Sequence, residues 1–441
     1  MLALMIMSAS CSKKDKWGAG DEKGQTAINR WVISQMQTYY YWNNHLPVNL
    51  DYDQDPIAFF NAIKFKDDRF SYIYYKKKYS LLSGTLMNTF GLELEGIEAD
   101  HIFKTQVLLV VPGSNAAALG LARGMFVKAI NGVVLTAANV GNVVADAITQ
   151  KTLSVILDNN ETLNIPAAYI AEPVVYKTAV FNTTAGDVGY LFMNSFEYQG
   201  VHDILNVFRA FKEQNIRNLI IDLRYNIGGS VPFSALVSAL IAPVQEEQTY
   251  VIYKGNATAG TIVSSFENEI GKQPQGYNFT LGQLTSYRPN LQRVYALTST
   301  LTMSAAELMI NNLKPYVQVV QIGERTFGKD MASLELKNDK ITGLSVYPLC
   351  FKLFNAGNKG NYSNGLQPDY LVQESAKLPL LPIGDKNDLL IRQCISLIEG
   401  NGQQQVQLSG SGMPSRVLSR YQSRASGRDG AALLSSLPEQ K

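Results

Sequence analysis

The chain has 441 residues, a formal net charge of +2 at pH 7 and 46% hydrophobic residues. A chain of this length can bury a sizeable core and hold about two to three domains, whereas its near-neutral charge gives no electrostatic footprint for nucleic acid. Three cysteines do not make a disulfide framework, and the three histidines, His45, His101 and His202, show no metal-ligand spacing. This argues against a zinc hydrolase and weakens the case for a Ser-His-Asp triad.

Residues 1–24 predict an export signal followed by a linker. The apolar run Met1–Met7 is too short to span a bilayer, and it is followed by Ser-Ala-Ser and then Cys11. This pattern resembles the cleavage site of a Bacteroidetes-type bacterial lipoprotein. It implies a lipid on Cys11 and a place at the cell envelope, on the periplasmic face or the outer membrane. No basic residue precedes the run and Ser8 stands where Leu is usual, so an ordinary N-terminus with a stray cysteine is the alternative.

Residues 25–80 predict a small helical region. Apolar residues recur at helical spacing from Thr26 onward, at Ile28, Trp31, Val32, Met36 and Tyr39. Two aromatic-rich segments follow, Tyr39–Trp42 and Arg69–Tyr75. We expect these rings to pack in a helical cap, and peptide binding by exposed rings is the alternative.

Residues 81–168 change to short apolar strands with glycine turns. The predicted elements are strands over Val107–Val111, Met125–Ile130 and Leu153–Leu157, a hairpin turn at Asn131-Gly132 and a helix over Ala138–Ile148. The run Pro112–Leu119 followed by Gly124–Gly132 resembles a PDZ domain, which implies binding of a chain terminus by strand addition. The matching carboxylate loop comprises Gly91, Leu92, Glu93 and Leu94, with Glu93 where a second Gly is usual.

Strands and helices alternate across residues 169–400, as in an α/β domain. The predicted elements are strands over Val188–Met193 and Leu219–Leu223, helices over Val201–Gln214 and Ser234–Ala242, and a closing helix over Asp385–Glu399. The polar stretch Gly255–Asn290 has weak periodicity and reads as an insertion. Residues 401–441 are rich in Gln, Ser, Gly and Arg and aperiodic, so we expect a disordered tail.

The stretch Val294–Ser333 contains the two candidate catalytic residues of the chain, Ser304 and Lys329. An apolar run gives way to hydroxylated residues and then to the periodic segment Ser304–Leu313, as when a strand feeds a helix through a tight turn. Ser304 would attack a carbonyl there while unpaired amides hold the oxyanion. Lys329 follows a second apolar run, and a lysine in an apolar pocket loses its proton more readily and can act as general base. A helix-capping serine and a solvated lysine are the alternatives.

Four motifs occur in order along the second half of the chain. They are Leu219–Gly229 with its paired glycines, Thr302–Glu307, Gly323–Lys329 and Gly365–Asp369. Together they resemble the carboxy-terminal processing (tail-specific) serine peptidase family, over about Leu81 to Glu374. The resemblance implies an α/β (α+β) protein, in which a protease domain of the ClpP/crotonase-like fold joins the β-rich PDZ-like domain and the helical N-terminal region.

The same resemblance implies roles for individual residues. Ser304 and Lys329 would be the catalytic pair, and the amides of Gly229 and Ala305 would form the oxyanion hole, with Gly228 as the other choice for that glycine. Family members often carry Gln four residues after the lysine, where this chain has Ser333; Ser333 is the shorter candidate to orient the lysine. No metal ion and no organic cofactor is needed.

The sequence therefore predicts a serine endopeptidase that cleaves peptide bonds in envelope proteins near their C-termini. Its expected partners are polypeptide substrates and, through the lipid anchor, a membrane. The rival interpretation is a non-catalytic peptide-binding lipoprotein, which Ser333 and Glu93 favour. A third keeps Ser304 as nucleophile but acts on a small ester or a glycan-linked acyl group.

Overall fold

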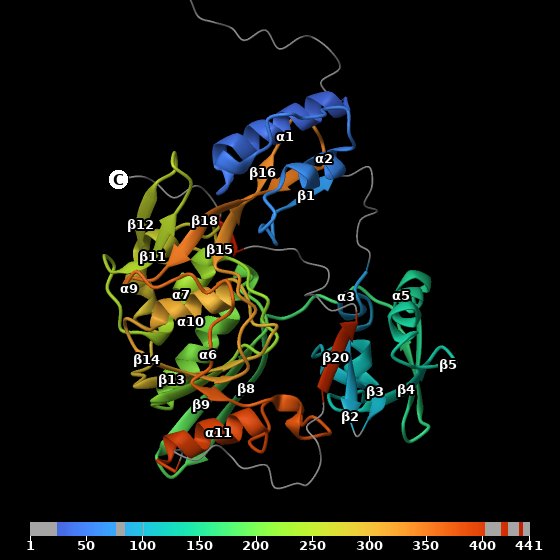
Figure 1. The fold of residues 1–441 in the computed structure, drawn as a ribbon. Coiled ribbons are helices and arrows are strands. Elements are labelled where there is room, and N and C mark those ends of the chain that lie inside the picture. The colour runs from blue at the N-terminus through green and yellow to red at the C-terminus, as the bar shows by residue number, and fades with distance from the viewer. Residues whose placement is uncertain (1–23, 76–83, 100, 402–415, 422–431, 435–441) are drawn as a thin grey trace, which may run out of the picture.

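The computed structural model describes residues 24–75, 84–99, 101–401, 416–421 and 432–434, which form three units (Figure 1). Cys11 and the predicted signal lie outside these residues. Among the helices of the described residues, none combines the length and the apolar character needed to cross a bilayer.

The N-terminal unit is a small helical layer, as the sequence predicts. Its elements are α1 (Gln25–Tyr39), the 3-10 turn η1 (Asn43–His45), α2 (Pro56–Ile63) and β1 (Tyr72–Tyr75). The apolar face of α1 is buried against α2, and Asp55 caps α2 by accepting hydrogen bonds from two backbone amides. Of the rings in the two aromatic-rich segments, Tyr40 is fully buried and Tyr74 is 46% exposed, and the others are half-buried. The expected core packing of these rings is therefore confirmed for Tyr40, is partial for the half-buried rings and is wrong for Tyr74.

The second unit is β-rich. Its elements are α3 (Leu86–Phe90), β2 (Leu92–Ala99), β3 (Ile102–Val110), α4 (Asn115–Ala118), β4 (Phe126–Ile130), β5 (Val133–Val134), α5 (Val140–Gln150), β6 (Thr152–Leu157) and β7 (Thr162–Pro166). Strands β2, β3, β4, β6 and β7 are neighbours in that order, and β5 pairs with β4. The hairpin turn at Asn131-Gly132 is confirmed, because both residues have positive φ angles, 48° and 78°.

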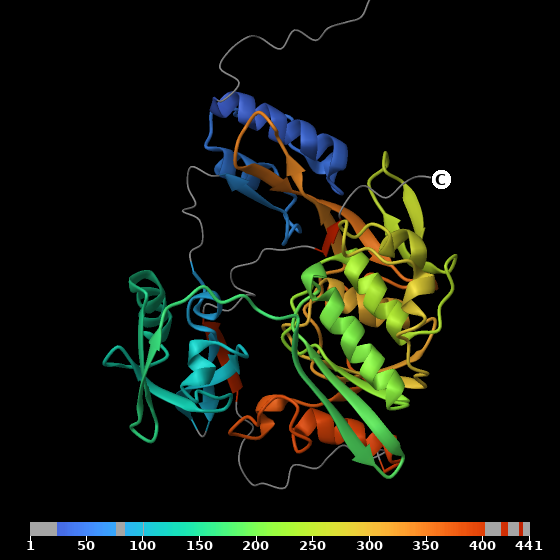
Figure 2. The ribbon, with the colours of Figure 1, turned by 180° about the vertical axis from the view of Figure 1, so that it is seen from behind.

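The third unit is built on a six-stranded, mostly parallel sheet, as the α/β alternation predicts. Its strands, in spatial order, are β19 (Tyr370–Leu371), β14 (Gln318–Gly323), β13 (Arg293–Thr298), β10 (Asn218–Asp222), β9 (Gly186–Met193) and β8 (Val175–Thr183). Helices α6 (Val201–Glu213), α7 (Val231–Ile241) and α10 (Ala305–Leu313) share one core with one face of the sheet. Helix α11 (Leu389–Ile398) packs on the other face (Figures 1 and 2).

A second sheet flanks the α/β unit and ties it to the N-terminal unit. Its strands are β12 (Thr261–Ser265), β11 (Thr249–Lys254), β18 (Leu349–Phe354), β15 (Met331–Leu334) and, at the edge, β21 (Ala432–Leu434). The short helices α8 (Phe266–Ile270) and α9 (Leu281–Leu284) lie within the stretch 255–290 that the sequence predicts as an insertion. Strands β16 (Leu336–Lys337) and β17 (Leu344–Tyr347) continue to β1, so one three-stranded sheet spans two units.

The prediction of a disordered tail after Asn401 is wrong for two segments. Arg416–Tyr421 forms β20, which pairs antiparallel with β2, and Ala432–Leu434 forms β21, which pairs parallel with β15. Strand pairing at a sheet edge is made by backbone groups, so a polar, aperiodic sequence can still take part in it.

Candidate active site

Ser304 stands at a strained turn between a strand and a helix. Strand β13 ends at Thr298, and Ser304 precedes α10 with φ 62° and ψ −121°, angles that a residue with a side chain rarely adopts. Its side chain is fully buried, and Oγ has no hydrogen-bond partner within the described part of the chain. Ser304 is the N-cap residue of α10, but a buried hydroxyl without a partner costs free energy, which is typical of a functional group.

The paired glycines lie directly against Ser304. A Cβ atom on Gly228 would come within 2.6 Å of the Ser304 Cβ, and a Cβ atom on Gly229 would come within 2.5 Å of the Phe196 carbonyl oxygen. Both glycines have positive φ angles, 96° and 141°. The Met303 amide donates to the Asn226 carbonyl over 3.1 Å, so the glycine loop and the serine turn are joined.

Two backbone amides at this junction are free to bind a negative charge. The Gly228 amide donates to the Asn226 side-chain oxygen at 2.9 Å, so it is already used. Within the described residues, neither the Gly229 amide nor the Ala305 amide donates a hydrogen bond. Ala305 is the first residue of α10, where amides lack intrahelical partners. Of the two glycines, Gly229 therefore fits the predicted oxyanion hole better, and that role stays a prediction.

The carboxylate of Glu307 joins the serine turn to the lysine loop. One oxygen accepts from the Ser304 amide at 2.9 Å and from the Lys329 amide at 2.8 Å. The other accepts from the Gly328 amide at 2.7 Å and from the Thr326 hydroxyl. The backbone amides of Ser304 and Lys329 thus donate to the same oxygen atom, which holds the serine turn and the lysine loop close together. Burial raises the pKa of Glu307, although its four hydrogen bonds act in the opposite direction.

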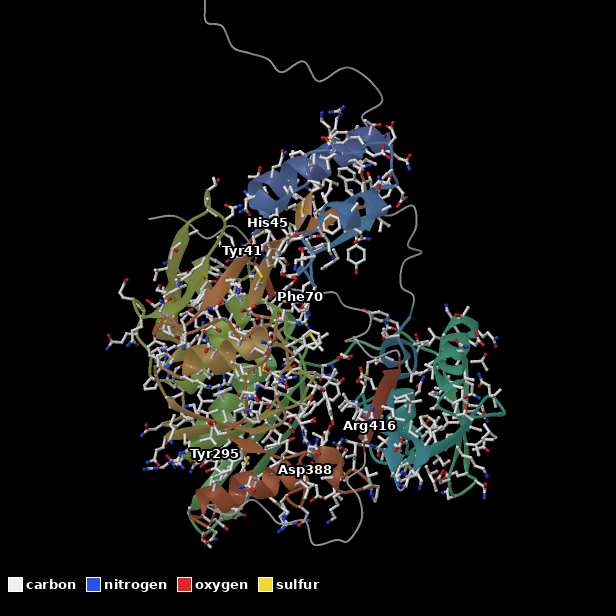
Figure 3. The ribbon with its side chains drawn as sticks, in the orientation of Figure 1. Tyr41, His45, Phe70, Tyr295, Asp388 and Arg416 are labelled. Carbon is white, nitrogen blue, oxygen red and sulfur yellow. The ribbon has the colours of Figure 1, made fainter. Side chains whose placement is uncertain are left out.

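Lys329 is buried against an aromatic ring of the N-terminal unit. The residue is only 1% exposed, and its Nζ atom lies 5.0 Å from the ring centre of Phe70. Phe70 lies where the N-terminal unit meets the α/β unit (Figure 3), and its ring is 5.8 Å from that of Phe327. The Arg69 guanidinium lies over both rings. The lysine predicted from sequence is therefore buried against an aromatic ring rather than solvated.

Ser333 is also buried, but it makes no contact that would orient the lysine. It lies in β15, and its Oγ has no hydrogen-bond partner in the part of the chain that the structure describes. The structure thus gives no support for the role predicted for it.

A cluster of charges lies beneath the glycine loop. Arg224 is fully buried and pairs with Asp222 at 2.7 Å, with Asp388 at 2.9 Å and with Glu374 at 3.1 Å. Arg123 of the β-rich unit reaches the same Glu374 at 2.8 Å. Asp388 also caps α11, at whose start it lies (Figure 3). With these partners, Asp222 and Arg224 are placed to order the loop rather than to transfer protons.

The predicted carboxylate loop is mostly strand. Leu92, Glu93 and Leu94 are buried in β2 and pair with β3, and only Gly91 precedes the strand, ending α3 with φ 81°. A Cβ atom on Gly91 would meet the Ser114 side chain at 2.3 Å, so its packing explains the glycine. Capture of a free carboxylate at these residues stays a prediction.

Two residues of the site carried little or no signal in the sequence. Glu307 reads as a residue of the first helical turn, and its partners at 326–329 are brought to it only by the fold. Phe70 lies in a different predicted domain from Lys329, and nothing in either segment indicates that they meet.

Two family models match the chain. The model described as peptidase family S41 matches residues 187–372, and the model described as peptidase S41 N-terminal domain matches residues 27–72. Together they cover more than half of the chain and include Phe70, Gly229, Ser304, Glu307 and Lys329, whereas Glu374, Asp388 and the β-rich unit lie outside them.

Two curated relatives are similar over about two thirds of the chain. A carboxyl-terminal-processing protease of Picosynechococcus sp. is 22% identical over 303 residues, which are 66% of this chain and 66% of the relative. The carboxy-terminal processing protease CtpA of Bacillus subtilis is 25% identical over 301 residues, 66% of this chain and 59% of the relative. The chain spans slightly less than two thirds of the length of these proteins.

Solved structures share the fold. A crystal structure described as an S41 protease from Bacteroides fragilis has a TM-score of 0.67 at 24% identity, covering 84% of this chain and 97% of that one. The photosystem II D1 C-terminal processing protease has a TM-score of 0.50 at 17% identity, covering 83% and 97%. The mixed α+β fold expected from the sequence is therefore shown.

Proposed function

Because this chain belongs to peptidase family S41, we propose that it is a serine endopeptidase in which Ser304 is the nucleophile and Lys329 the general base. The observation that carries this proposal is the shared carboxylate: Glu307 holds the backbone amides of both residues through one oxygen. Such a link fixes the strained serine turn and the lysine loop relative to each other, as a reaction between two side chains requires.

The proposed reaction is acyl transfer. Neutral Lys329 takes the proton from the Ser304 hydroxyl as Oγ attacks the scissile carbonyl carbon, and the amides of Gly229 and Ala305 stabilise the oxyanion. Lys329 then gives the proton to the leaving amine, and water releases the acyl group by the same route. Burial of Lys329 supports the role of base, since an apolar surrounding disfavours the charged amine.

The proposed substrates are polypeptides of the bacterial envelope that are cut near their C-termini. The names of the two curated relatives support C-terminal processing. The β-rich unit supports it too, because a PDZ-like domain would present an extended tail by strand addition. We further propose that a lipid on Cys11 anchors the enzyme at the envelope; only the sequence pattern around Cys11 supports this part.

The test uses the soluble form, residues 24–441, and an unfolded protein with an apolar C-terminal tail, with products identified by mass spectrometry. Wild type should cut this substrate, and Ser304→Ala and Lys329→Ala should each lower kcat/KM by at least about a thousandfold. Matched controls are Ser238→Ala, another buried serine, and Lys352→Ala, a lysine of β18 that lies near Asp330. Both controls should keep most of the activity.

Two other results would favour the rival functions. Tail binding without cleavage by the wild type would favour the non-catalytic binding protein. Reaction of Ser304 with a small activated ester but with no polypeptide would favour the acyl esterase. The anchor is tested separately by labelling of the full chain with a radioactive fatty acid, which Cys11→Ala should abolish.

A further inference from the structure

The two C-terminal strands bind to different units of the same molecule. Strand β20 pairs antiparallel with β2 of the β-rich unit, from Leu94 with Tyr421 to Glu98 with Arg416. Strand β21 pairs parallel with β15, aligning Ser333 with Leu433. Both pairings use sheet edges, since β20 and β21 are the outermost strands of their sheets (Figures 1 and 2).

Strand β20 lies between a sheet edge and a helix, in a position suited to an extended peptide. It lies on the edge strand β2 and also contacts the flanking helix α5. Val417 is partly buried and aligned with the fully buried Ile97, whereas Arg416 and Leu418 are exposed. Figure 3 labels Arg416 at the start of β20. A strand added between a sheet edge and a helix, with alternate side chains inward, is how such domains bind peptides.

Strand β21 lies beside the elements that carry the proposed catalytic groups. Its partner β15 begins at Met331, just after Lys329, and β21 also contacts α7, which begins just after Gly229 and Ser230. A polypeptide whose scissile carbonyl is held by the Gly229 amide, as proposed, would lie close to this junction. The edge of β15 is therefore a place where the chain of a substrate can pair.

We infer that strands Arg416–Tyr421 and Ala432–Leu434 are a substrate mimic bound in cis: the chain's own C-terminal part occupies both sheet edges that an extended substrate tail would use. An incoming tail must displace them before it is cut. The inference rests on the proposed function for its effect on rate, but not for the occupancy of the sheet edges. A tethered occupant competes strongly, because its effective concentration reaches about the millimolar range.

Occupancy is tested in residues 24–441 by the double variant Glu98→Cys/Arg416→Cys. These residues are partners in the register of β2 and β20, and antiparallel partners have Cα atoms about 4.5–5.5 Å apart, within the range of a disulfide. Cys350 and Cys394 are buried and do not compete. The matched control is Glu98→Cys/Leu418→Cys, because Leu418 has no partner in that register. Mild oxidation should cross-link the first pair far more completely than the second.

The effect on catalysis is measured on the same sample. The cross-linked enzyme should cut the unfolded protein at least about tenfold more slowly than the same enzyme after reduction, since a tail that cannot leave blocks the edge of β2. Absence of the cross-link, or equal rates before and after reduction, would overturn the inference. If the reduced enzyme is inactive while the cross-link forms, the occupancy stands and the proposed peptidase function fails.

A second variant releases the strand instead of locking it. Val417→Asp places a charge against Ile97 and beside the acidic residues Glu95 and Glu98 of β2, so β20 should detach and kcat/KM should rise severalfold. Leu418→Asp puts the same charge on the exposed side and should leave the rate within about twofold. An unchanged rate in Val417→Asp would contradict the proposed competition.

Discussion

Two buried carboxylates of the α/β unit, Asp388 and Glu307, differ in what balances their charge. Burial alone would raise the pKa of Asp388, but Arg224 and Arg123 outweigh burial and lower it. Glu307 faces three backbone amides and a hydroxyl instead of a cation, and burial raises its pKa. A guanidinium compensates desolvation of a carboxylate in a way that neutral donors do not.

The difference separates a structural cluster from the proposed catalytic site. Around Arg224 each carboxylate has an ionic partner, and the cluster ties the β-rich unit to the α/β unit. Around Glu307 no cation offsets the loss of solvation of the carboxylate, so burial disfavours its charged form. The nearby Ser304 has a strained backbone and a hydroxyl without a partner in the described residues. Strained residues and buried polar groups that lack a matching partner are typical of sites where the geometry for a reaction matters more than stability.

The largest expected effect comes from removal of the cation. Arg224→Met leaves Asp222, Glu374 and Asp388 buried around an apolar side chain, so the free energy of unfolding should fall by about 3–5 kcal/mol. Urea denaturation followed by circular dichroism measures this. Arg209→Met, at an exposed position of α6, should change the value by less than about 0.5 kcal/mol. Equal midpoints for Arg224→Met and wild type would show that the cluster does not stabilise the fold.

The next effect should come from Glu307→Gln. The glutamine amide cannot accept hydrogen bonds on its nitrogen, so one side of the Ser304–Lys329 link is lost and kcat/KM should fall about a hundredfold, or ~2.7 kcal/mol. Stability should respond to pH as well. Because the folded pKa is raised above the ordinary 4.5, wild type loses stability as pH rises from 4.5 toward that raised pKa, and the variant lacks this loss.

Asp388→Asn is the matched control for that pH dependence. The lowered pKa of Asp388 means that its contribution to stability is fully present above the ordinary value of 3.8 and is lost as pH falls through the folded pKa. The penalty of Asp388→Asn should thus shrink toward acid pH, whereas that of Glu307→Gln should shrink toward neutral pH. Parallel curves for the two variants would remove the distinction between the two carboxylates.

A smaller effect is expected from the aromatic cover of Lys329. Phe70→Ala should admit water to the amine, favour its charged form and move the rising limb of kcat/KM against pH to higher pH, with a rate loss of about tenfold at pH 7. Phe70→Leu keeps the apolar cover and should move the limb little. Tyr74→Leu, at an exposed ring of the same unit, should leave the profile unchanged. A limb that moves to lower pH in both Phe70→Ala and Phe70→Leu would show instead that the ring stabilises the charged amine, because loss of that attraction favours the neutral form.

Local signals were enough to predict the turn at Ser304 but not the groups around it. The apolar run, the hydroxylated turn and the helical period lie next to one another in sequence, so the strand, turn and helix over Arg293–Leu313 follow from short-range chemistry. The link through Glu307 forms only because the loop at 326–329 folds back against α10. That contact is tertiary, so it cannot be predicted from helix propensity.

The C-terminal strands show a second limit of sequence reasoning. The tail has no alternation of apolar residues, so it lacks the signal of a half-buried strand. Its pairing depends on unpaired backbone groups at the edges of β2 and β15. Such an edge accepts many sequences, and it becomes visible only when the sheet has been assembled.

Ser333 gives the smallest expected effect, and it tests an expectation that the structure does not support. Its Oγ has no partner within the described residues, so Ser333→Ala removes no hydrogen bond and should change kcat/KM by less than about twofold. Ser333→Gln introduces a larger side chain at a fully buried position of β15 and should lower the free energy of unfolding by about 1–3 kcal/mol. A tenfold loss of kcat/KM in Ser333→Ala, with unchanged stability, would show that the hydroxyl does orient Lys329 during the reaction. With the expected result, the orientation of the lysine depends instead on the link from its backbone to Glu307 and on the ring of Phe70.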